Sequence, residues 1–92
     1  MPYMLVRNRV KDFDKWIHVF KTHPHSISHP DYGLHLINMW RDVSDPNNVF
    51  FMFEVESIER ANVFLQEGGG TDAGELAGVI DGELHYIESV EL

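Results

Sequence analysis

The segment from Val49 to Glu56 has the composition of a β-strand and is apolar at nearly every position. Successive side chains of a strand point to opposite faces of a sheet, so this segment presents apolar groups on both faces. One face carries Val49, Phe51, Phe53 and Val55, and the other carries Phe50 and Met52. An antiparallel sheet with one wet face would instead show alternating apolar and polar residues. We therefore expect both faces of the sheet that contains this strand to be covered.

The remaining patterns predict the element order β-α-β-β-α-β. We expect strands at about residues 3–10, 34–43, 49–56 and 83–90. Asp12 can cap a first helix that carries Phe13, Trp16, Ile17 and Phe20 on one face, and Pro24 ends it near Thr22. Ser57 can cap a second helix. This order indicates an α+β, ferredoxin-like fold, in which a four-stranded antiparallel sheet has both helices on one face.

The connections carry clear turn signals. Residues 45–48, Asp-Pro-Asn-Asn, predict the turn of a hairpin between the second and third strands. Residues 23–33 contain two prolines and a glycine and are expected to form a loop. The run Gly68–Gly70 is expected to end the second helix, and a short further helix is expected to reach Ala77.

The uncovered face of this sheet predicts a homodimer. Two helices cover one face only, and exposing Phe50 and Met52 on the other would forgo roughly 1.5–3 kcal/mol each. Trp40 adds a further aromatic residue to the same hairpin. With no third layer in 92 residues, a second copy of the chain related by two-fold symmetry is the expected cover. The alternative is a monomer that leaves a few aromatic side chains exposed.

Composition limits the class of protein. The 15 acidic residues against seven Lys and Arg give a net charge of −8, which disfavours nucleic acid as a partner. The sequence has no cysteine, so disulfides and thiolate metal sites are excluded. No apolar run approaches the roughly 20 residues of a membrane span. We expect one cytoplasmic domain over residues 1–92 that does not bind membranes.

Several short segments resemble the dimeric α+β barrel superfamily, which includes antibiotic biosynthesis monooxygenase-like domains and polyketide cyclases. They are Tyr3-Met4-Leu5-Val6-Arg7, Asp12-Phe13-Asp14-Lys15-Trp16, Val19-Phe20, Asp45-Pro46-Asn47, Phe53-Glu54 and Ala77-Gly78-Val79. The chain is most similar to small members of unknown function. The resemblance implies a homodimer whose sheets meet as a barrel, a pocket for a small hydrophobic or aromatic ligand, and in some members oxidation without any cofactor.

Haem-degrading members of the superfamily match this chain at Asn8 but also need a His and a Trp near the second helix. Residues 57–84 contain neither, so haem degradation is not expected and no cofactor is predicted. The polar residues used by cofactor-free monooxygenases cannot be assembled completely either. Two functions stay open: a cofactor-independent monooxygenase, cyclase or isomerase, and a non-catalytic binding or stress-associated module.

Three polar residues are candidates for catalysis. Asn8 alternates with Met4 and Val6, where a buried amide needs a hydrogen-bond partner such as a ligand oxygen, the backbone or water. Glu54 shares a face with Phe50 and Met52, where it would act as a proton carrier; the alternative is a surface ion pair with Arg7 or Arg41.

His23 follows the first helix and is the candidate at the rim of the pocket. Trp40, Phe50 and Met52 are the candidates for substrate binding. His18, His23, His25 and His29 match no established zinc spacing, so no metal site is predicted.

Overall fold

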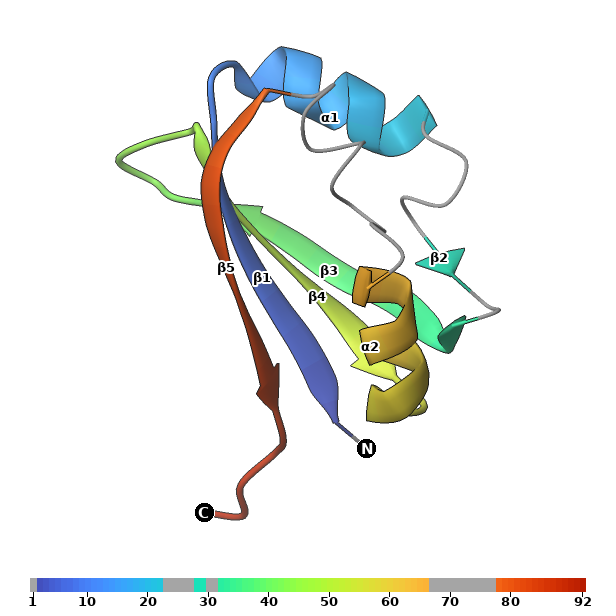
Figure 1. Cartoon of the computed structure of the whole chain (residues 1–92). Coiled ribbons are helices and arrows are strands. Elements are labelled where there is room, and N and C mark those ends of the chain that lie inside the picture. Colours follow the sequence, from blue (N-terminus) through green and yellow to red (C-terminus); the bar gives the residue numbers. More distant parts are fainter. Residues whose placement is uncertain (1, 23–27, 30–31, 67–77) are drawn as a thin grey trace.

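The computed structural model describes residues 2–22, 28–29, 32–66 and 78–92, and its elements follow the expected order (Figure 1). The main strands are β1 (Tyr3–Val10), β3 (Leu34–Arg41), β4 (Asn48–Val55) and β5 (Val79–Ile87). The helices are α1 (Phe13–Thr22) and α2 (Ile58–Gln66). A two-residue strand β2 (Ser28–His29) was expected to be loop. It adds to the edge of β3 through backbone pairing, which residue propensities do not reveal.

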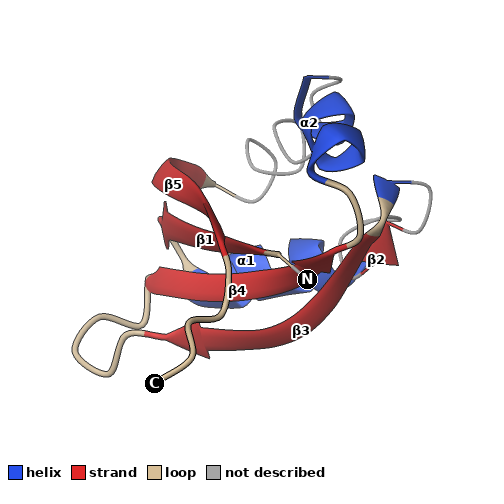
Figure 2. Cartoon of the chain, turned by 90° about the horizontal axis from the view of Figure 1, so that it is seen from below, coloured by secondary structure: helices blue, strands red, loops and turns tan. Residues whose placement is uncertain are grey.

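The strands form one antiparallel sheet in the order β2-β3-β4-β1-β5 (Figure 2). Without the short β2, this is the strand order of the ferredoxin-like fold, so the predicted fold class is correct. β1 lies between β4 and β5, and Tyr3 is paired with Glu54 on one side and with Ile87 on the other. This register decides which side chains share a face.

Hydrogen bonds at the helix starts and in the hairpin agree with the sequence signals. The Asp12 carboxylate accepts the Asp14 N–H at 3.0 Å, and Ser57 Oγ accepts the Arg60 N–H at 3.3 Å. In the hairpin turn, the Asn48 N–H donates to the Asp45 carbonyl at 3.0 Å. Both caps and the turn are therefore confirmed.

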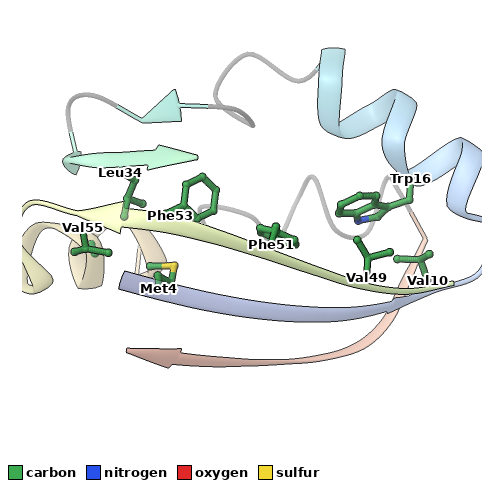
Figure 3. Packing of buried hydrophobic residues seen from close by; sticks show 9 residues of the cluster. Met4, Val10, Trp16, Leu34, Val49, Phe51, Phe53 and Val55 are labelled. Carbon is green, nitrogen blue, oxygen red and sulfur yellow. The ribbon is translucent and has the colours of Figure 1, made fainter. Parts of the chain in front are cut away.

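One face of the sheet is packed under the helices and forms the core (Figure 3). Its buried members are Met4, Val10, Trp16, Leu34, Val49, Phe51, Phe53, Val55 and Ala61. Trp16 reaches from α1 over β4, with its ring centroid 5.1 Å from that of Phe20 and 5.8 Å from that of Phe51. Such aromatic contacts stabilise the pair beyond their buried area. They fix α1 on the sheet.

The opposite face, which we call the open face, carries the second apolar set of β4. Phe50 and Met52 lie there and are half-buried, and Trp40, the ladder partner of Phe50, is 45% exposed. Among the described residues, no helix packs on this face. The apolar residues that α1 and α2 turn toward the sheet belong to the core cluster on the opposite face. The expectation that the helices shelter only one face of the sheet is therefore correct.

Candidate functional site

An open hollow of about 470 Å³ lies on the open face, where β3, β4, β1 and the segment after β5 come together. Its wall is formed by Tyr3, Ile37, Met52, Glu54, Ile87, Glu88 and Ser89. The volume falls within the range of small-molecule sites, about 300–1,000 Å³. The wall is mostly apolar and includes two carboxylates.

A bulge in β3 gives this hollow one of its apolar side chains. The register between β3 and β4 shifts between Leu36 and Asn38, so Ile37 has no partner on β4. Bulges of this kind redirect a side chain. Ile37 lines the hollow and is 45% exposed. Sequence alternation alone could not place Ile37, since the extra residue changes which side chains face which way.

Glu54, Met52, Phe50 and Trp40 share the open face, as expected for the candidate binding residues. Glu54 and Met52 line the hollow directly, whereas Phe50 and Trp40 form the next ladder pair along the same face. The structure thus shows that the four residues share one face, although Phe50 and Trp40 do not line the hollow, and the roles of all four in binding and catalysis stay predictions.

The alternative of an ion pair between Glu54 and Arg7 or Arg41 is wrong. The Arg7 guanidinium binds Glu83 at 2.7 Å and Asp81 at 3.2 Å. The Arg41 guanidinium lies 4.7 Å over the Phe13 ring on the helix-covered side. Within the described residues, Glu54 makes no ion pair with any basic side chain.

Asn8 lies on the other face of the sheet. It alternates with Met4 and Val6, which pack in the core under the helices, and its ladder partners are Val49 and Gly82. Its amide is partly buried and makes no side-chain hydrogen bond to any residue that the structure describes. The sheet therefore separates Asn8 from Glu54, and the two cannot act on the same atom of one ligand.

Tyr86 shares the helix-covered face with Asn8, and His85 lies on the open face. The Tyr86 hydroxyl donates to Asn62 Oδ1 on α2 at 2.8 Å, and burial raises the pKa of the phenol above its ordinary value of 10.0. His85 Nε2 lies 3.1 Å from Glu83 Oε2. The register settles the orientation of this pair, which alternation along β5 alone left undecided.

An ion-pair network on the open face was not predicted. In addition to its two carboxylate partners, Arg7 donates to Asn48 Oδ1 at 3.1 Å. The hydrogen bond from Arg7, followed by that from His85, lowers the pKa of Glu83. The alternation of Asp81, Glu83 and His85 along β5 was the available signal, but Arg7, the partner of Asp81 and Glu83, lies 74 and 76 residues away from them in the sequence.

His23, proposed at the pocket rim, lies outside the described residues, as do His25, Gly68–Gly70 and the short helix expected to reach Ala77. Among the residues that are described, no group of three or more His, Cys, Asp or Glu side chains could hold a metal ion. In the same part of the chain, no helix is long and apolar enough to cross a membrane. The cytoplasmic location stays a prediction.

Solved structures of similar fold cover nearly the whole chain. A candidate antibiotic biosynthesis monooxygenase from Bordetella bronchiseptica superposes with a TM-score of 0.79 at 12% identity, over 98% of this chain and 97% of that one. A corresponding protein from Nitrosomonas europaea gives 0.71 at 11% identity, over 99% and 100%. An uncharacterised NIPSNAP domain protein from Burkholderia xenovorans gives 0.71 at 10% identity, over 98% and 95%.

No family model and no curated protein matches the sequence. The structural likeness shows that the chain has the fold of antibiotic biosynthesis monooxygenase-like proteins, as the sequence resemblance implied, and that NIPSNAP domain proteins share this fold. At identities of 10–15%, the likeness concerns the fold alone.

Proposed function

We propose that this chain binds a small hydrophobic molecule in the hollow of its open face, and that two copies pair through these faces to form a homodimer. The observation that carries the proposal is a mostly apolar hollow of about 470 Å³ on a sheet face that no helix of the described residues covers. Glu54 in its wall provides a polar group that can orient a ligand.

The size and composition of the open face support the homodimer. Trp40 and Ile37 are each 45% exposed and Ile87 is 38% exposed, so one surface of the chain shows several large apolar side chains. The Cα trace measures 34 × 33 × 18 Å, and its broad face is large enough for the roughly 800 Å² that a stable interface buries on each partner. A self-complementary interface would cover this surface in both copies.

Sedimentation equilibrium tests the dimer. We expect a species of about twice 10.7 kDa at micromolar concentration. The variant Ile37→Asp places a charge on the open face and should shift the protein toward the monomer. Val63→Asp is the matched control, because Val63 is 42% exposed but lies on α2. A wild-type protein that sediments only at 10.7 kDa would overturn this part of the proposal.

Catalysis is the second candidate function, and Asn8 is the observation in its favour. An amide among apolar core residues that has no side-chain partner within the described residues can donate a hydrogen bond to a ligand carbonyl. The fold neighbours described as monooxygenases make oxygenation of a small molecule the reaction class to test. Such a reaction would use the helix-covered side of the sheet rather than the hollow.

A thermal-shift screen of small aromatic and aliphatic compounds distinguishes the two faces. For compounds that bind in the hollow, Met52→Trp should fill the space and abolish the shift, whereas Asn8→Ala should leave it unchanged. Circular dichroism checks that each variant remains folded. If Asn8→Ala abolishes binding and Met52→Trp does not, the ligand lies on the helix-covered side and the proposed site is wrong.

A further inference from the structure

Building on the proposed function, we infer that the ligand of the hollow is an amphiphilic cation, namely an organic amine with an apolar body. The hollow combines apolar side chains with two carboxylates, and none of the described residues in its wall is basic. Such a surface is complementary to a molecule that carries one positive charge on a hydrophobic frame.

The two carboxylates, Glu54 and Glu88, come from different elements. Glu54 belongs to β4, and Glu88 follows the last residue of β5. The register brings them to the same hollow, because Tyr3 on β1 pairs with Glu54 on one side and with Ile87 on the other. Within the described residues, neither carboxylate makes an ion pair. A ligand cation would therefore not compete with a cation of the chain among these residues.

The basic side chains of the open face have partners elsewhere. Arg7 binds Asp81 and Glu83, and Arg9 binds Asp45 at 3.2 Å. His35 is the ladder partner of Glu54, but its Nε2 lies 3.6 Å from Glu56 Oε2. The basic side chains of this face are thus engaged away from the hollow, whose two carboxylates have no paired cation among the described residues.

Dimer formation would make the unpaired negative charge at the hollow energetically unfavourable. A second copy that covers the open face would remove water from Glu54 and Glu88, and a carboxylate that loses water without a counter-charge is strongly disfavoured. An amine in the hollow supplies that counter-charge, and its apolar part contacts side chains such as Met52 and Ile87. An acid of the same size would add a third negative charge, and the net charge of −8 would also disfavour its approach.

Three probes with one apolar body test the inference. They are 4-phenylbutylamine, 4-phenylbutan-1-ol and 4-phenylbutyrate, each titrated calorimetrically into the full chain at low ionic strength. We expect the amine to bind about tenfold more tightly than the alcohol, and the acid to bind most weakly. Added salt should reduce the advantage of the amine, since it screens the attraction between the free amine and the negatively charged chain.

Substitutions that remove charge without changing shape locate the effect. Glu54→Gln and Glu88→Gln should each lower the affinity for the amine severalfold and leave the affinity for the alcohol unchanged. Glu91→Gln is the matched control, because Glu91 lies in the same C-terminal segment but does not line the hollow.

The outcomes separate this inference from the function on which it rests. If the alcohol and the amine bind equally, or if the Gln variants keep the preference for the amine, the ligand class is wrong while a hydrophobic binding site remains. If none of the three probes binds, the proposed site fails together with the ligand class.

Discussion

Asn8 and Gly82 lie opposite each other in the ladder between β1 and β5, and Asn8 Oδ1 occupies the space that a side chain at position 82 would need. A Cβ atom on Gly82 would lie 2.5 Å from Asn8 Oδ1 and 2.8 Å from the carbonyl oxygen of Arg7. The glycine therefore allows Asn8 to hold its position against β5.

Gly82→Ala should lower the free energy of unfolding by about 1–3 kcal/mol, because both the amide and the strand must move to admit the methyl group. Urea denaturation measures the loss. The double variant with Asn8→Ala relieves the contact with Oδ1 but not the contact with the Arg7 carbonyl. We expect the two losses to be non-additive, and strict additivity would show that Asn8 does not require the glycine.

Two other glycines, Gly33 and Gly78, have positive φ angles of 68° and 80°. Alanine at either position should cost about 1–2 kcal/mol from the backbone alone. A Cβ on Gly33 would also lie 3.0 Å from Glu56 Cβ, whereas at Gly78 the nearest neighbours lie 3.7 Å away. Gly33→Ala should therefore be the more destabilising of the two in urea denaturation. Equal losses would mean that Glu56 shifts without cost.

Local sequence signals were sufficient to predict the helices and most strands. The apolar spacing of α1 and the capping residue Asp12 before it predict a helix that buries Trp16, as observed. Both signals are readable from the sequence because capping and periodicity act within a few residues. The predicted bounds of β1 are those observed. The bounds of β5 differ from the predicted residues 83–90. The strand ends at Ile87 because its partner strand, β1, begins at Tyr3. Its start at Val79 likewise depends on pairing with Val10.

The candidate site was only partly predictable, because its composition depends on register between distant strands. Alternation correctly grouped Asn8 with Met4 and Val6, and Glu54 with Met52. It could not show that these two groups lie on opposite faces, since that depends on how β1 pairs with β4. Glu88 was missed altogether, because it joins the hollow only through the pairing of β5 with β1.

The two tryptophans should report separately on the core and on the open face. Trp16 is 3% exposed and Trp40 is 45% exposed. In Trp40→Phe, acrylamide should hardly quench the remaining fluorescence. In Trp16→Phe, quenching of Trp40 should be strong in dilute protein and should weaken as the concentration rises, because in the proposed homodimer a second copy covers the open face. Quenching of Trp40 that does not change with concentration would contradict the proposed interface.

The ion pair between Arg7 and Glu83 should make stability depend on acid pH. Hydrogen bonding to Arg7 lowers the pKa of Glu83 below its ordinary value of 4.5. A carboxylate with a lowered pKa stabilises the folded state above its unfolded pKa, and this stabilisation is lost as pH falls through the folded pKa. The stability difference between wild type and Glu83→Gln should therefore be constant near neutral pH and shrink below about pH 4.5.

The Arg7→Met background provides the control for this pH dependence. Glu83 loses its main hydrogen-bond donor there, so Glu83→Gln should have a smaller effect that changes less with pH. Urea denaturation between pH 3 and pH 7 gives both comparisons. An unchanged pH dependence in the Arg7→Met background would assign the effect to His85, the second donor to Glu83.

The phenol of Tyr86 should titrate above its ordinary pKa. Burial raises the pKa of its phenol above 10.0, so the folded state retains this proton where the unfolded chain has lost it. Its contribution to stability is therefore complete below pH 10 and is lost as pH rises through the folded pKa. Absorbance at 295 nm should show a component above pH 10 that is absent in Tyr86→Phe. Asn62→Ala removes the acceptor of the Tyr86 hydroxyl, yet a late component should persist, because burial raises the pKa of the phenol. Loss of this component in Asn62→Ala would show that contact with α2 keeps Tyr86 buried.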